Sequence, residues 1–165
     1  MAGRRWLIVV ILAASILHAI AIANSILPAQ DGLKFIRIAR QFQKDSWPSV
    51  VRESDQHPLY PSLVAVAEPV VAFFNGASPE TWRIAAQIVA AIAAVAVLIP
   101  LYSLTKTLFS DRIAAIAVAI YALLPVHAEI GHDTLSDSLG LLFTMLSLRW
   151  GIAAIQTEKP LPTIA

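Results

Sequence analysis

Four long apolar stretches alternate with polar segments along the chain. A helix that crosses the hydrocarbon core of a bilayer, which is about 30 Å thick, needs roughly 20 mostly apolar residues. Residues 6–27 and 84–104 reach this length, and residues 113–128 and 138–155 come close to it. Arg149 lies near the end of the last stretch, where a long side chain can extend to the membrane surface. The pattern predicts an all-α fold, a polytopic integral membrane helix bundle with about four spanning helices.

Basic residues set the expected orientation of these spans. Arg4 and Arg5 precede the first stretch, and the short turn at residues 106–112 carries further basic side chains. Cytoplasmic connections are enriched in Lys and Arg, so we expect both termini in the cytoplasm and residues 28–83 on the external side. A cleaved signal peptide is the competing interpretation of residues 6–27. The apolar part of such a peptide is only about 7–15 residues long, which favours an uncleaved span.

The external segment contains an amphipathic pattern at residues 31–44. Apolar side chains fall on one side of a helix, and Lys34, Arg37 and Lys44 fall on the other. A basic amphipathic helix of this kind lies on a membrane surface, with its apolar face in the acyl boundary. The alternative is a helix that packs its apolar face on other helices and leaves the basic face in water.

A second apolar segment of the external region, residues 59–74, contains Pro61, Glu68 and Pro69. Prolines and a central carboxylate make a straight spanning helix costly. Apolar stretches of this length are more often interfacial or re-entrant, so we predict an interfacial segment. If it spanned the membrane, every later loop would change sides.

Composition narrows the function classes. Hydrophobic residues make up 58% of the 165 residues and charged residues 14%, against about 25% charged in ordinary soluble domains. The formal net charge of +1 leaves no broad basic surface, so we expect no nucleic-acid partner. The chain has no cysteine, which excludes disulfides, thiolate metal sites and a cysteine nucleophile.

Candidate chemistry first appears just outside the first predicted span. Asp31 opens the amphipathic segment, where it is suited either to cap the helix or to act as a general base at the membrane boundary. His57 and Tyr60 follow, enclosed by Pro58 and Pro61, whose rings restrict the backbone. A turn explains the prolines but not the two hydrogen-bonding side chains.

A second polar cluster separates the last two apolar stretches. Residues 127–137 hold two histidines and three carboxylates, among them His132, Asp133 and Asp137. No pair of histidines four residues apart encloses a glutamate, so we predict no metal ligands, while a divalent cation stays open. Asp133 is also suited to cap the following helix. Asp137 lies at the start of the last apolar segment, where an acid usually faces a cavity or a partner.

The order of these motifs resembles the N-terminal region of the C-type glycosyltransferase superfamily. The branch is that of protein mannosyltransferases, lipid A aminoarabinose transferases and their bacterial relatives. The matching residues are Asp31 after the first span, the helix around residues 38–40, the His57-Pro58-Leu59-Tyr60-Pro61 turn, and residues 124–127 with 131–133. The sequence differs from many relatives in having Gly32, and not a second acid, after Asp31, and one proline fewer in the turn.

The resemblance implies a donor sugar linked to a polyprenyl phosphate and inversion at the anomeric carbon. Asp31 would be the base that takes the proton of the acceptor, and Asp133 a second acid of the same pocket. His57 and Tyr60 would order the external loop near the donor.

Further predictions concern binding, the extent of the enzyme and its location. Arg37 and Arg40 would attract the lipid phosphate; this prediction comes from their charge and not from a family motif. His132 and Asp137 would line the substrate pocket. We expect the chain to be the N-terminal part of a longer enzyme, acting in the bacterial inner membrane on its external or periplasmic face. The lipid bilayer is its other partner, and the sugar and acceptor stay open.

Two other classes of protein share part of this pattern. A transporter or flippase also has acids within or beside its helices, here Glu68, Asp133 and Asp137. No repeat at corresponding positions is visible in the sequence, which weakens that alternative. A membrane subunit without catalytic activity is the third interpretation.

Overall fold

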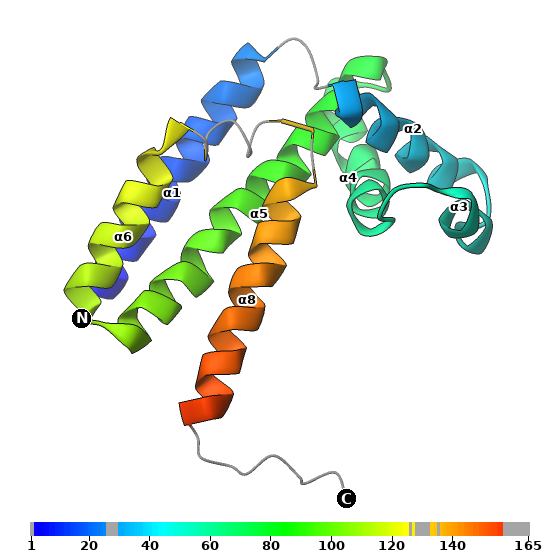
Figure 1. The fold of residues 1–165 in the computed structure, drawn as a ribbon. Helices are drawn as coiled ribbons and strands as arrows, with labels where there is room; N and C mark the ends of the chain where they lie inside the picture. The colour runs from blue at the N-terminus through cyan, green and yellow to red at the C-terminus, as the bar shows by residue number, and fades with distance from the viewer. Residues whose placement is uncertain (1, 26–29, 126, 128–132, 135, 157–165) are drawn as a thin grey trace, which may run out of the picture.

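The computed structural model describes residues 2–25, 30–125, 127, 133–134 and 136–156, and in this part of the chain the regular structure is all helical (Figure 1). The helices are α1 (Ala2–Asn24), α2 (Gln30–Lys44), α3 (Trp47–Glu53), α4 (Leu59–Asn75), α5 (Pro79–Leu108), α6 (Asp111–Leu123) and α8 (Asp137–Gln156). The prediction of an all-helical membrane bundle is confirmed.

Three of these helices are long and apolar enough to cross a membrane, namely α1 from Arg5 to Asn24, α5 and α8. Helix α5 is the centre of the bundle and contacts α1, α4, α6 and α8 (Figure 1). With 30 residues it is about 45 Å long, more than the hydrocarbon core requires. The part of α5 that exceeds this length is available to pack against the helices outside the bundle, α2 and α4.

The predicted third span, residues 113–128, corresponds to the shorter helix α6. This helix has 13 residues and is therefore about 20 Å long, less than the thickness of the hydrocarbon core. It ends because Leu124 precedes Pro125, and a residue before proline avoids the helical conformation; Leu124 is extended, with ψ 133°. A fourth span therefore stays a prediction.

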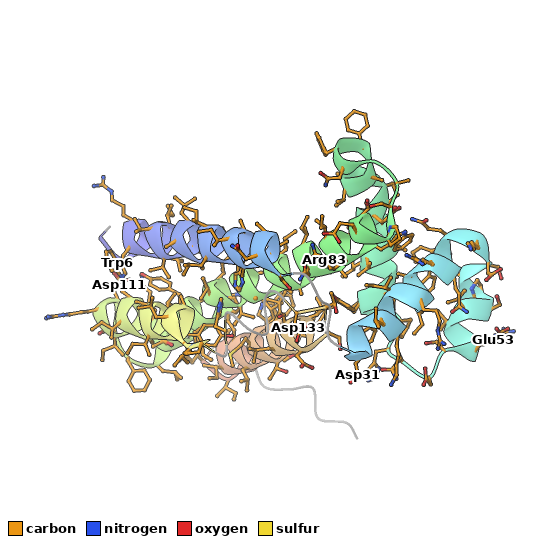
Figure 2. The ribbon with its side chains drawn as sticks, turned by 90° about the horizontal axis from the view of Figure 1, so that it is seen from above. Trp6, Asp31, Glu53, Arg83, Asp111 and Asp133 are labelled. Carbon is orange, nitrogen blue, oxygen red and sulfur yellow. The ribbon has the colours of Figure 1, made fainter. Side chains whose placement is uncertain are left out.

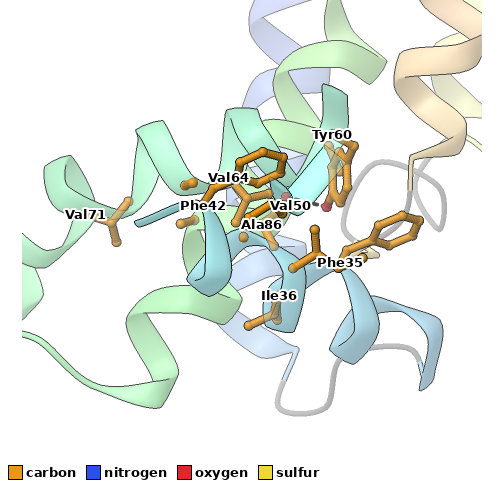
Figure 3. Close-up of a cluster of buried hydrophobic side chains, with 13 residues drawn as sticks. Phe35, Ile36, Phe42, Val50, Tyr60, Val64, Val71 and Ala86 are labelled. Carbon is orange, nitrogen blue, oxygen red and sulfur yellow. Dashed lines mark hydrogen bonds between the residues drawn. The ribbon is translucent and has the colours of Figure 1, made fainter. Parts of the chain in front are cut away.

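Helix α2 packs its apolar face inside the protein. The side chains of Phe35, Ile36, Ile38, Ala39 and Phe42 are buried, in one cluster with residues of α4 and α5 (Figure 3). The structure thus supports the second interpretation of residues 31–44, because the apolar face covers other helices. The basic side chains on the opposite face remain exposed.

Helix α4 runs across the direction of the long helices (Figures 1 and 2). It has 17 residues, and one of its faces packs on α2 and α5. Its other face exposes Leu59, Leu63, Val66, Val70 and Phe73. Helix α4 ends at Gly76, whose φ of 77° lies in the left-handed region that favours glycine. Its interfacial position stays a prediction.

Candidate functional site

Asp31 lies in the first turn of α2, at the end of the bundle away from Trp6 and Asp111 (Figure 2). Its side chain is exposed, and its Oδ1 lies 3.0 Å from the Nζ atom of Lys34. A carboxylate in the first helical turn is favourable because it faces the positive end of the helix dipole. The ion pair orients the carboxylate without removing it from water.

The residue after Asp31 contacts the residue after Asp133. A Cβ atom placed on Gly32 would lie 2.6 Å from the Cβ of Thr134 and still closer to its hydroxyl oxygen. Thr134 is fully buried. Because consecutive Cα atoms are about 3.8 Å apart, the Cα atoms of Asp31 and Asp133 lie within about 13 Å of each other. The two predicted acids, about 100 residues apart in the chain, thus share one end of the bundle (Figure 2).

Asp133 is half-buried in the segment that leads into α8. Its Oδ1 accepts a hydrogen bond from the backbone N–H of Thr134, at 3.1 Å. The carboxylate of Asp133 therefore faces the backbone of Thr134, the residue that contacts α2. This bond orients the carboxylate group of Asp133.

Tyr60 connects the three helices α2, α4 and α5. Its side chain is 1% exposed, its hydroxyl donates to the backbone oxygen of Ala86 at 2.9 Å, and its ring meets that of Phe35 edge to face at 5.2 Å (Figure 3). Burial raises the pKa of the Tyr60 phenol, and the negative charge of Asp133 raises it further. Tyr60 therefore keeps its proton and acts as a hydrogen-bond donor that holds α4 on α5.

The other predicted residues are spread more widely. His57 is exposed in the loop before α4, and Asp137 is exposed in the first turn of α8. His132 lies outside the described residues. Within the described part of the chain, no three His, Cys, Asp or Glu side chains are grouped in a way that could hold a metal ion.

Arg37 and Arg40 face a different part of the molecule from Asp31. They lie six and nine positions further along α2, which turns them by about 120° and 180° around the helix axis. Both line a groove of about 480 Å³ between α2 and the first turns of α5. The residues predicted as one site therefore lie on different sides of α2.

Sequence reasoning missed the residue at the inner end of this groove, Arg83. Its side chain pairs with the carboxylate of Glu80 and donates to the Oε1 of Gln87 at 2.6 Å. The Nε2 of Gln87 in turn donates to the hydroxyl of Ser25, at 3.1 Å, which ties α5 to the end of α1. The signal in the sequence is the spacing of Glu80, Arg83 and Gln87, which places all three on one helical face.

A second polar contact lies within the bundle. The rings of His18 in α1 and His127 stack with centroids 4.9 Å apart, and the ring of Tyr121 in α6 meets that of His127 edge to face at 4.7 Å. His18 and His127 are both buried. These rings join α1 to the end of α6 and lie apart from Asp31.

In the described part of the chain, the protein is a helical bundle with three helices long enough to cross a membrane, and Asp31 and Asp133 lie at one end of it (Figure 2). The family model for dolichyl-phosphate-mannose-protein mannosyltransferases matches residues 71–163. The chain belongs to this family, which points to a mannosyltransferase-type glycosyltransferase. The match includes Asp133 and Asp137, whereas Asp31 and the turn at residues 57–61 lie before it. Comparison with curated proteins and with solved structures finds no match.

Proposed function

We propose that the protein transfers a sugar from a polyprenyl-phosphate-linked donor to an acceptor on the external or periplasmic face of the membrane. Asp31 is the general base of this reaction. The observation that supports the proposal most directly is the contact between Gly32 and Thr134, because it brings Asp31 and Asp133 to one end of the bundle.

In the proposed reaction, Asp31 accepts the proton of the acceptor as the acceptor's oxygen attacks the anomeric carbon of the sugar. The bond between that carbon and the phosphate oxygen breaks, and the phosphate leaves with the electron pair on its lipid. Attack from the side opposite the phosphate inverts the configuration of the anomeric carbon. The exposure of Asp31 supports this role, because an acceptor in water can reach its carboxylate.

Asp133 is the second acid of the proposed pocket. The N–H of Thr134 orients its carboxylate, and in the proposed pocket this carboxylate binds a hydroxyl of the sugar. Tyr60 holds α4 on α5, and the exposed His57 and Asp137 are proposed to bind substrate. His132 is a further proposed substrate-binding residue. In this scheme Asp31 removes the proton and the other residues bind and orient the substrates.

The position of the N-terminus supports an external site. Trp6 and Asp111 lie at the end of the bundle opposite to Asp31 and Asp133 (Figure 2). The basic residues that precede Trp6 favour the cytoplasmic side for that end. The two acids then lie on the external side.

The test is transfer activity of the protein reconstituted in lipid vesicles with a polyprenyl-phosphate sugar. Asp31→Asn keeps the shape of the side chain but cannot accept the proton, so we expect a loss of about 100-fold to 10,000-fold in turnover. Asp45→Asn is the matched control, since Asp45 is an exposed acid just beyond the other end of α2. Unchanged transfer in Asp31→Asn would reject Asp31 as the base. Ion flux across the vesicles that needs no sugar would support a transporter instead.

A further inference from the structure

The groove between α2 and the first turns of α5 carries more positive than negative charge. Arg37, Arg40 and Lys44 contribute from α2, and Arg83 contributes from α5, while Glu80 is the one acid among the described residues that line it. Leu33 and Ile36 add apolar surface. Four cations around one carboxylate leave an excess of positive charge that attracts an anion.

The groove has a fixed cation at its inner end and flexible ones at its rim. Arg83 is 8% exposed and is held by Glu80 and by Gln87, so its guanidinium is already positioned. Arg37, Arg40 and Lys44 are exposed and can close on a bound group. Guanidinium groups match the oxygens of a phosphate in pairs, so a phosphate is the anion that this arrangement favours.

The groove lies at the level where the membrane helix begins. The apolar run of α5 starts at Ile84, directly after Arg83, and the guanidinium of Arg40 lies over the ring of Trp82, at 5.3 Å from its centroid. Tryptophan side chains concentrate at the boundary between membrane and water. The groove therefore opens at the depth of lipid head groups.

The position of the groove separates it from the proposed transfer site. In the donor, one oxygen atom joins the anomeric carbon to the phosphate, so a base beside that carbon also lies close to the phosphate. Arg37 and Arg40 instead point about 120° and 180° away from Asp31 around α2. We propose that the groove binds the phosphate of an anionic phospholipid of the surrounding leaflet and thereby fixes the external loop on the membrane surface. This proposal does not rest on the transfer reaction.

The experiment measures lipid binding to the purified chain in a neutral detergent. Short-chain phosphatidylglycerol is the probe, phosphatidylcholine is the zwitterionic comparison, and bound lipid is counted by native mass spectrometry. We expect the double variant Arg37→Gln/Arg40→Gln to bind phosphatidylglycerol roughly thirtyfold more weakly. Arg52→Gln is the matched control, because Arg52 is an exposed arginine of the neighbouring α3 that does not line the groove.

A second variant gives a change in the opposite direction. Glu80→Gln removes the carboxylate that the described lining of the groove contains, so we expect phosphatidylglycerol to bind several-fold more tightly. Loss of folding cannot produce tighter binding, so this result separates recognition from damage to the protein. Added salt should weaken binding to the wild-type protein more than binding to the double variant, because the interaction is between charges.

Three results would overturn the proposal. The first is equal binding of phosphatidylglycerol to the wild-type protein and the double variant. The second is equal competition by inorganic phosphate, since the groove would then not recognise a lipid. The third is displacement of phosphatidylglycerol by an equimolar amount of polyprenyl phosphate, which would assign the groove to the donor. Asp31→Asn should bind phosphatidylglycerol like the wild-type protein, so failure of the transfer proposal and failure of this one are distinguishable.

Discussion

Gly32 lies directly against Thr134, and this contact joins the first turn of α2 to the segment before α8. A methyl group on Gly32 would overlap the side chain of Thr134, whose Cβ lies 2.6 Å from the position of the added atom. The absence of a second acid after Asp31 follows from this packing, because Thr134 occupies the space that a side chain at position 32 needs. The glycine is therefore required for close approach and not for backbone freedom.

The first prediction is that Gly32→Ala destabilises the protein despite the higher helix propensity of alanine. Overpacking of this kind costs about 1–3 kcal/mol, more than the gain of up to about 1 kcal/mol expected from replacing a helical glycine. Thermal unfolding in detergent measures the change. Transfer activity should fall as well, since the overlap separates Asp31 from Asp133.

Gly140→Ala is the control for this prediction. Gly140 is also in a helix, but an added Cβ there meets no atom within 4 Å among the described residues. We expect this variant to be as stable as the wild-type protein or more stable. The double variant Gly32→Ala/Thr134→Gly should recover part of the loss. A Gly32→Ala protein that unfolds at the wild-type temperature would contradict the contact.

The helices could be predicted because their signals are local. Apolar length marks α1, α5 and α8, and the period of apolar residues marks α2. The end of α6 at Leu123 also has a local signal, which is Pro125. The apolar residues continue beyond this proline, so the length of the apolar stretch predicts a longer helix. A proline inside an apolar stretch therefore predicts the end of the helix better than the length of the stretch does.

The site could be predicted only in part, because its contacts join distant segments. The contact of Gly32 with Thr134 links residues about 100 positions apart, and no local pattern contains it. Asp31 and Asp133 were found through the order of motifs. The groove that Arg37 and Arg40 line could not be predicted, because charge in a sequence does not show which side of a helix faces which neighbour. Arg83 was missed because it stands at the edge of an apolar run.

The second prediction concerns pH and Tyr60. Burial and the charge of Asp133 raise the pKa of this phenol above its ordinary value of 10.0. Above pH 10 the unfolded chain releases the proton while the folded protein retains it, so the free energy of unfolding falls as pH rises. The slope for one proton is about 1.4 kcal/mol per pH unit. Tyr60→Phe removes this contribution to the slope.

Chemical denaturation between pH 8 and pH 11 tests the prediction in both proteins. At pH 8 the variant should be about 1 kcal/mol less stable, because the backbone oxygen of Ala86 loses its donor. The difference should shrink as pH rises above 10. A constant difference across this range would show that Tyr60 titrates like an exposed tyrosine.

The third prediction concerns Asp111, at the opposite end of the bundle. Its Oδ1 lies 2.8 Å from the Nζ of Lys106 and accepts a hydrogen bond from the hydroxyl of Tyr102 at 2.6 Å. Two hydrogen bonds lower the pKa of Asp111 below its ordinary value of 3.8. The bond from Lys106 has the larger effect and the bond from Tyr102 the next. The lowered pKa stabilises the folded state above pH 3.8, and this contribution is lost as pH falls further.

Asp111→Asn should therefore lower the melting temperature at neutral pH. The difference from the wild-type protein should narrow below about pH 4, where the unfolded carboxyl group is protonated. Asp45→Asn serves as the control, since Asp45 forms no ion pair among the described residues. Equal melting temperatures for Asp111→Asn and wild type at pH 7 would mean that these bonds add nothing to stability.

The fourth prediction is that the two ends of the bundle lie on opposite sides of the membrane. The chain has no cysteine, so a single introduced thiol reports its own position. Ser54 lies between α3 and α4, in the segment that we predict to be external, and Ser110 lies in the turn between α5 and α6, so Ser54→Cys and Ser110→Cys report on the two ends. In intact cells a membrane-impermeant maleimide should label Ser54→Cys and not Ser110→Cys, and after permeabilisation it should label both. Labelling of both thiols before permeabilisation, or of Ser110→Cys alone, would place Asp31 on the wrong side for an external transfer reaction. Because Gly32 contacts Thr134, the result for Ser54→Cys also locates Asp133.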